Sequence, residues 1–136
     1  MSVEFVDTNI FVCAHDGGAG KKHVKSVELV ARLFEDASGA LSIQVLSEFY
    51  NAATKKLSMK SAEAEAAIGD LGGWLIHRAG HADVLKACQL HRRYKIAWWD
   101  AMVLNSAMEV GCSILWSEDL NHGQRYDKVT VRNPFL

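Results

Sequence analysis

The chain has 136 residues, of which 49% are hydrophobic and 23% are charged, and its 15 Lys and Arg against 16 Asp and Glu leave a formal net charge of −1. This composition excludes disordered, collagen-like and repeat architectures, and we expect residues 1–136 to form a single domain. A chain of this length buries roughly two-thirds of the surface that its unfolded form exposes, so its core needs no disulfide or structural metal. The near-neutral charge also argues against binding nucleic acid over a broad basic surface, and any such role must rest on a local site.

In chain order, strands are expected to alternate with helices. The predicted elements are a strand at 3–6, a loop at 16–20, a helix at 22–37, a strand at 40–43, helices at 44–57 and 58–71, a strand at 74–76, helices at 81–94 and 98–110, a strand at 112–117, a loop at 118–124 and a strand at 129–132. The first strand runs into a turn or helix start at Asp7-Thr8-Asn9. Because no tight hairpin signal joins neighbouring strands, the pattern predicts an α/β fold with a mostly parallel sheet.

Three of the predicted helices have informative patterns. In the helix at 22–37, apolar residues recur at helical spacing and predict a buried stripe of Val24, Val27, Val30, Ala31 and Phe34. Ser42 is the expected N-cap of the helix at 44–57. The helix at 98–110 is apolar nearly all the way round, which is typical of a helix at the centre of a fold, and Trp98 and Trp99 are expected to pack inside.

The cysteines indicate the compartment. Cys13, Cys88 and Cys112 are odd in number and far apart, which fits buried thiols in a reducing environment and a cytoplasmic protein. The sequence shows no targeting segment and no apolar run that could span a bilayer, so we expect no association with membranes.

Four carboxylates occupy positions that the packing of an α/β fold does not by itself explain. Asp7 and Asp119 follow predicted parallel strands, and such acids meet at the edge where α/β sheets bind ligands, although each alone is more simply explained as a cap. Asp100 lies in an otherwise apolar helix, where an unpaired carboxylate is costly, although a first-turn position would be favoured by the helix dipole. Glu48 borders the apolar stripe of its helix and could also be solvated.

If Asp7, Glu48, Asp100 and Asp119 converge, each pair of charges about 4 Å apart repels by roughly 4 kcal/mol at an effective dielectric near 20. A cation relieves that repulsion, and all-oxygen ligands suit Mg²⁺ or Mn²⁺. Such an ion would orient a phosphodiester and activate a water molecule that attacks phosphorus. The residues therefore predict nuclease chemistry.

At this point the sequence resembles a known family. The matching segments are Asp7-Thr8-Asn9, Ser47-Glu48, Trp99-Asp100-Ala101, Leu115 to Gly123 (LWSEDLNHG) and Asn133-Pro134-Phe135. This pattern, in this order along the whole chain, resembles the PIN-domain family and, within it, the VapC-type ribonuclease toxins of bacterial toxin–antitoxin pairs.

The resemblance implies a three-layer α/β/α sandwich, Mg²⁺- or Mn²⁺-dependent cleavage of RNA, a homodimer and a cognate antitoxin that blocks the site. By resemblance, the catalytic metal ligands are Asp7, Glu48, Asp100 and Asp119, with Thr8, Asn9 and Ser117 in support. Glu118 stands beside Asp119 and could present its side chain instead; the family pattern favours Asp119, two residues after Ser117.

Basic residues just before Asp100 are candidates for holding RNA. Arg92, Arg93 and Lys95 could neutralise phosphates, although a solvated helix face is an equally good interpretation for the two arginines. His122 could touch substrate, but a polar turn is the better explanation.

Two other functions remain open. A receiver-like signalling module would also hold Mg²⁺ at strand ends, but it would carry adjacent early acids, whereas Asp7 has no acidic neighbour. A PIN-like nuclease could also act on DNA, which the sequence does not distinguish from RNA.

Overall fold

The computed structural model describes residues 2–136. Its elements are β1 (Glu4–Val6), α1 (Thr8–Ala14), η1 (Gly17–Ala19), α2 (Lys21–Asp36), β2 (Gly39–Ser42), α3 (Ile43–Lys56), α4 (Ser61–Asp70), η2 (Leu71–Gly73), β3 (Leu75–His77), α5 (His81–Tyr94), α6 (Trp98–Glu109), β4 (Ile114–Trp116), β5 (Arg125–Tyr126) and β6 (Val129–Arg132). The predicted alternation of strands and helices is confirmed.

The strands form a six-stranded sheet in the order β3-β2-β1-β4-β6-β5. Every neighbouring pair is parallel except β5 and β6, so the predicted mostly parallel sheet is confirmed. The chain places β2 and β3 on one side of β1 and β4 on the other. This change of direction between β1 and β4 opens a crevice at the carboxyl ends of the two strands, which is where ligands bind in α/β sheets.

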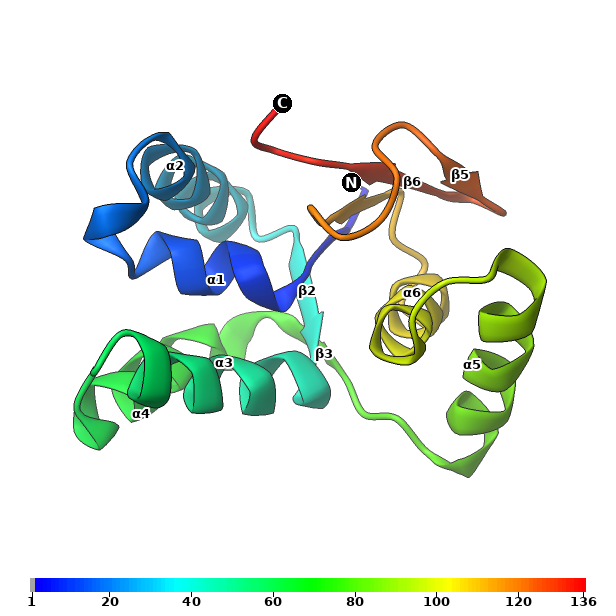
Figure 1. Ribbon diagram of the computed structural model, residues 1–136, viewed down its shortest axis with the longest axis horizontal. Helices are drawn as coiled ribbons and strands as arrows, with labels where there is room; N and C mark the ends of the chain where they lie inside the picture. The colour runs from blue at the N-terminus through cyan, green and yellow to red at the C-terminus, as the bar shows by residue number, and fades with distance from the viewer. Residues whose placement is uncertain (1) are drawn as a thin grey trace.

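Helices cover both faces of the sheet, as expected for an α/β/α sandwich. Figure 1 shows α1, α2, α3 and α4 on one side of the strands and α5 and α6 on the other. The short strands contribute apolar side chains to the core, and Phe5, Val6, Leu41 and Leu115 are completely buried between the helical layers. Burial of these side chains stabilises the sheet and fixes the positions of the residues that follow each strand.

The central position predicted for α6 is confirmed, because every residue from Ala101 to Ala107 is buried. Ser42 caps α3 as predicted, since its Oγ accepts a hydrogen bond from the Val45 amide at 3.2 Å. Among residues 2–136, no helix combines the length and the apolar character that crossing a membrane requires.

The predicted buried stripe of α2 is wrong. The side chains that α2 buries are Ser26, Leu29 and Leu33, whereas Val27 and Phe34 are 42% and 43% exposed. The helix carries two apolar stripes at helical spacing, and packing selects the one with the leucines. The second stripe is therefore left on the surface.

The segment after Asp7 is a two-turn helix, α1, which confirms the predicted helix start. Two other local features differ from the sequence-based expectation. Helix α4 begins at Ser61 and not at 58, because Ser58 adopts a left-handed conformation with φ of 55°. The expectation of no tight hairpin is wrong, since β5 and β6 pair antiparallel around Asp127, whose φ is also 55°.

Candidate active site

Asp7 lies where β1 ends and α1 begins. Its side chain is the N-cap of α1, and its Oδ1 accepts a hydrogen bond from the Thr8 amide at 2.7 Å. Its Oδ2 accepts a second bond from Ser117 Oγ at 2.9 Å. Only 6% of the residue is exposed. These contacts fix the carboxylate at the mouth of the crevice between β1 and β4.

Asp119 comes from the loop after β4. Register between β1 and β4 pairs Val6 with Trp116, so the residues that follow the two strands meet. Ser117 accepts a hydrogen bond from the Asp119 amide at 3.1 Å, and Asn9 donates its side-chain amide to Asp119 Oδ2 at 3.3 Å. Ser117 and Asn9 thus hold the loop carboxylate close to Asp7.

The neighbouring Glu118 has a different environment. Its carboxylate forms an ion pair with Lys22 Nζ at 2.8 Å, on α2. Because Glu118 is engaged there, the loop presents Asp119 to the crevice, which supports the choice made from the sequence.

Asp100 reaches the same place from the first turn of α6. One carboxylate oxygen from each of Asp7, Asp100 and Asp119 lies within 4.8 Å of the others. Three segments far apart in the sequence therefore bring three acids together. The structure places no basic side chain in an ion pair with any of them among residues 2–136.

Glu48, on α3, lies on the wall of the same pocket but outside this group of three. Its Oε1 accepts hydrogen bonds from Thr8 Oγ1 at 3.1 Å and from Gln44 Nε2 at 3.0 Å. Thr8 thereby links the first acidic motif to α3. Gln44, one turn before Glu48, is a supporting residue that the sequence did not reveal.

The electrostatics of the cluster favour binding of a cation. Burial, followed by the charges of Asp119 and Asp100, raises the pKa of Asp7 to about 7, against the lowering effect of its two hydrogen bonds. Burial and then the charges of Asp119 and Glu48 raise the pKa of Asp100. Burial and the Glu118 charge raise the pKa of Asp119. Hard carboxylate oxygens that repel one another at this distance fit a divalent ion such as Mg²⁺ or Mn²⁺.

Two hollows meet at these acids. One, of about 330 Å³, lies between α3 and α6 and is lined by all four carboxylates. The other, of about 390 Å³, is lined by residues 94–97 and by the loop after β4. Asp100 and Asp119 border both hollows. A polymeric ligand could therefore cross the carboxylates from one hollow into the other.

The expected RNA-holding residues lie at varying distances from this centre. Arg92 and Arg93 are exposed near the end of α5 and line neither hollow; Arg93 lies over the Tyr94 ring at 5.1 Å. Lys95 lines the second hollow. His122 Nδ1 accepts the Asn133 amide at 2.9 Å and so anchors the C-terminal segment.

Other side chains of the pocket were not anticipated. The expectation that Trp99 packs inside is wrong, because Trp99 is 59% exposed and lines the pocket beside Asp100. Trp98 is partly buried against α5. Lys55 and Lys56, in the last turn of α3, line the opposite wall. Their sequence signal, two adjacent lysines at a helix end, is too common to indicate a site.

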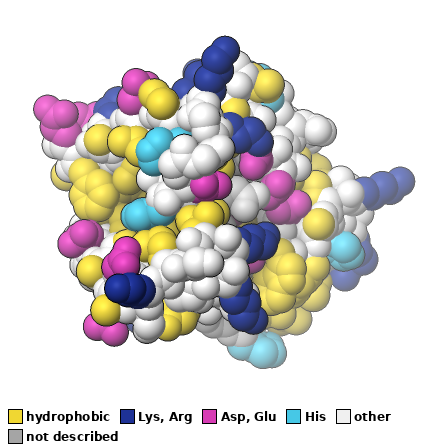
Figure 2. All heavy atoms as spheres, turned by 60° about the vertical axis from the view of Figure 1, so that its left-hand side comes forward, with side chains coloured by type: hydrophobic (Ala, Val, Ile, Leu, Met, Phe, Trp, Pro, Cys, Tyr) yellow, Lys and Arg dark blue, Asp and Glu magenta, His cyan; other side chains and the backbone are white. Residues whose placement is uncertain are grey.

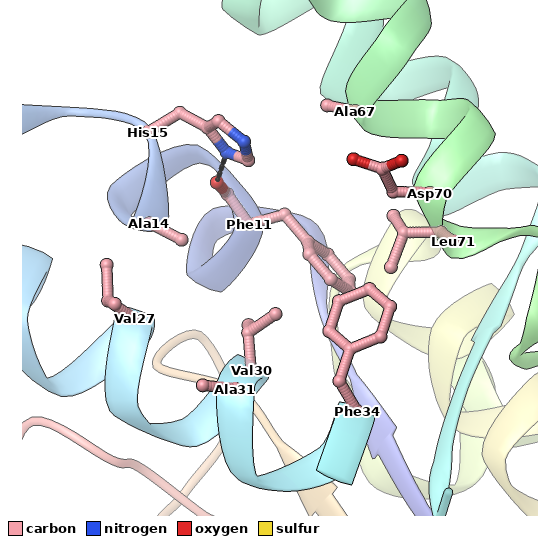
Figure 3. Close-up of a pocket in the computed structure, with 10 residues that line it drawn as sticks. All are labelled: Phe11, Ala14, His15, Val27, Val30, Ala31, Phe34, Ala67, Asp70 and Leu71. Atoms are coloured by element: carbon pink, nitrogen blue, oxygen red, sulfur yellow. Dashed lines mark hydrogen bonds between the residues drawn. The ribbon is translucent and has the colours of Figure 1, made fainter.

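A separate apolar groove lies between α1, α2 and α4 (Figure 3). Its volume is about 270 Å³, and two of the residues that line it, Phe11 and Phe34 (Figure 3), each pack against Trp74, with ring centroids 5.5 and 5.1 Å apart. The unburied stripe of α2 forms one wall, with Val27 and Val30. With Asp70 as its only carboxylate among the lining residues, the groove lacks the donors of a metal site.

Comparison with known proteins agrees with this geometry. The family model described as the PIN domain matches residues 5–128. No curated protein matches the sequence closely enough to count as a relative.

Three solved structures share the fold. A toxin–antitoxin complex from Klebsiella pneumoniae is 18% identical with a TM-score of 0.70, over 98% of each chain. The sarcin–ricin loop cleaving toxin VapC20 of Mycobacterium tuberculosis is 19% identical with a TM-score of 0.69, over 85% of this chain and 89% of that one. A DNA-bound VapBC from Salmonella typhimurium is 16% identical with a TM-score of 0.67, over 98% and 99%.

Proposed function

The chain belongs to the PIN domain family, and from that premise we propose that it is a Mg²⁺- or Mn²⁺-dependent endoribonuclease. The observation that carries the proposal is the convergence of Asp7, Asp100 and Asp119 within 4.8 Å at a sheet edge, next to an open hollow. The fold's similarity to a toxin that cleaves RNA supports RNA as the substrate.

Each residue has a definite task in this proposal. Asp7, Asp100 and Asp119 are the ligands of the ion, and Glu48, held by Thr8 and Gln44, faces it from the pocket wall. Ser117 and Asn9 orient the carboxylates. A bound divalent ion supplies positive charge for the phosphate and lowers the pKa of water.

The residues themselves shape the reaction site. The buried position of Asp7 excludes solvent from one side of the cluster, while Asp100 and Asp119 remain open to a ligand in either hollow. The protein supplies no adjacent early acids for a phosphoacceptor, which argues against the receiver-like alternative.

Cleavage of RNA by the purified protein tests the proposal. An RNA and a DNA of the same sequence are incubated with Mg²⁺, Mn²⁺ or EDTA. We expect cleavage of the RNA with either metal, none with EDTA, and at least a 100-fold loss of rate in Asp100→Asn.

The matched control is Asp127→Asn, an exposed aspartate in the β5–β6 turn with a φ of 55° that asparagine tolerates. This variant should cleave as fast as the wild type. Equal rates for Asp100→Asn would assign the activity to another site or to a contaminant, and cleavage of DNA alone would refute the RNA assignment.

We further propose that the protein is the toxin of a toxin–antitoxin pair, acting as a homodimer in the cytoplasm. The similar structures from Klebsiella pneumoniae and Salmonella typhimurium are toxin–antitoxin and VapBC complexes, which supports a protein partner for this chain. The apolar groove in Figure 3, with Val27 and Phe34 exposed, offers that antitoxin a contact surface.

Expression in a host cell tests the toxin role. Production of the protein alone should arrest growth and fragment RNA, whereas the Asp7→Ala variant should do neither. Unchanged growth and RNA on expression of the wild type would contradict a toxin.

A further inference from the structure

We propose that the pocket between α3 and α6 is a nucleotide subsite for single-stranded RNA, in which a base stacks on Trp99 and a phosphate contacts Lys55 and Lys56. This inference rests on the proposed nuclease function and names the substrate feature that the site recognises. It assigns a task to three side chains that the metal centre does not use.

Trp99 is exposed although it lies at the start of a largely buried helix. Helix α6 is buried from Ala101 to Ala107, yet Trp99, one residue before Asp100, is 59% exposed. Its side chain lines the hollow that the four carboxylates share. The exposed indole offers a flat apolar face, and a nucleobase can stack on that face.

Two lysines line the same hollow as Trp99. Lys55 and Lys56 are exposed on the wall that α3 contributes to the same hollow, and neither forms an ion pair with any residue in the range 2–136. By contrast, Lys22 and Lys86 are paired with Glu118 and Glu109. A position at a helix C-terminus favours lysines in general, but it does not account for a tryptophan across the hollow.

Together, Trp99, the two lysines and the carboxylates indicate which ligand fits this hollow. On the face seen in Figure 2, basic side chains lie beside carboxylates and a hydrophobic patch. A flat apolar ring, free ammonium groups and a phosphodiester-cutting centre in one hollow together match one nucleotide of a strand. In a duplex the faces of each base are covered by its neighbours, so stacking on Trp99 requires an unpaired, unstacked base. The subsite therefore favours loops, bulges and single strands.

Binding measurements test this independently of catalysis. The Asp100→Asn protein serves as the parent, and fluorescence anisotropy reports its affinity for a fluorescein-labelled 12-nucleotide unstructured RNA and for the matched RNA duplex. We expect Trp99→Ala to weaken single-strand binding about tenfold and Trp99→Phe to retain most of it. Neither change should alter the weaker binding of the duplex.

Two lysine variants separate charge from position. Replacing Lys55 and Lys56 together by alanine should reduce the slope of log affinity against log salt by about 0.7, the contribution of one phosphate contact on a single strand. Lys60→Ala, an exposed lysine outside the pocket, should leave affinity and slope unchanged.

Specific results would overturn the inference. Single-strand affinity that is unchanged in Trp99→Ala would do so, as would equal losses for single strand and duplex. A lower sedimentation mass in Trp99→Ala with unchanged RNA affinity would show that Trp99 covers a protein interface. Cleavage by the wild type distinguishes failure of the subsite from failure of the nuclease proposal. If the wild type cleaves RNA but Trp99→Ala leaves KM and affinity unchanged, only the subsite proposal fails. If it does not cleave, the nuclease proposal fails.

Discussion

At the scale of single residues, the surroundings of Asp7 disfavour the ionised form of its carboxylate, which is the form that binds a metal ion. Asp7 is buried at the end of β1, where its hydrogen bonds cap α1, and its pKa is raised to about 7 because burial and two nearby carboxylates disfavour its charge. A metal ligand has to be ionised. If the proposed metal site is correct, the arrangement costs stability in the absence of a cation and regains it when one binds.

Asp7→Asn should stabilise the metal-free protein at neutral pH. Between the unfolded pKa of about 4 and the folded pKa of about 7, the folded wild type holds a proton that the unfolded chain has lost, so stability falls as pH rises through this window. Urea unfolding in EDTA should show the variant to be more stable than wild type by about 2–4 kcal/mol at pH 7.5 and by little at pH 4. A variant that is less stable than wild type at pH 7.5 would contradict this account.

The pKa of Glu4 is shifted in the opposite direction, to a lower value. Hydrogen bonds from Arg32, at 2.8 and 3.2 Å, and from the Trp116 indole, at 2.8 Å, lower its pKa although it is buried. A lowered pKa gives stability that is present above the unfolded value and is lost as the pH falls through the folded one.

We expect Glu4→Gln to reduce the free energy of unfolding by about 1–2 kcal/mol at pH 7. The difference between variant and wild type should shrink as the pH falls through the lowered pKa of Glu4 and the carboxylate becomes protonated. Chemical unfolding across this pH range measures it, and a loss that stays constant with pH would show that shape, and not charge, matters at this position.

At the scale of elements, the strands position the chemistry. β1 and β4 are parallel neighbours that end side by side, so Asp7 and Asp119 meet because of the register. α6 brings in Asp100 and α3 brings in Glu48. A change that shifts one strand should therefore affect the site at a distance.

Gly39, at the start of β2, allows the close packing of this strand to be tested. A Cβ added there would lie 2.5 Å from the Trp74 ring, so Gly39→Ala forces the ring or the strand to move. We expect a loss of about 1–3 kcal/mol in unfolding free energy. The control is Gly72→Ala, where a Cβ meets nothing within 4 Å. Equal stability of the two variants would show that the close approach is unimportant.

The sequence carries clearer signals for single charged residues than for which face of a helix is buried. Strand ends and a charge inside an apolar helix are local signals, and they singled out Asp7, Asp119 and Asp100 as candidates, with Glu48 as a fourth, while their convergence stayed conditional until the structure brought the three aspartates together. The exposure of Trp99 gave no signal, because α6 is apolar all round and its sequence does not show which side stays open. The buried face of α2 was misjudged because Leu29 and Leu33 compete with a second stripe at the same spacing.

At the scale of the whole molecule, charge is balanced in sum but separated in space. The net charge is −1, yet four carboxylates gather in one hollow while Lys55 and Lys56 occupy its wall. A near-neutral net charge is therefore compatible with the proposed action on RNA, in which a cation would offset the acids locally. The apolar groove between α1, α2 and α4 lies apart from this centre and is the surface that we propose for the antitoxin.

The central claim is that Asp7, Asp100 and Asp119 form one divalent-metal site, and calorimetric titration of Mn²⁺ into the metal-free protein tests it most directly. The account predicts saturable binding by the wild type and by Asp127→Asn, and binding at least tenfold weaker in Asp100→Asn. Equal Mn²⁺ affinity in Asp100→Asn and the wild type, or no saturable binding by the wild type, would contradict it.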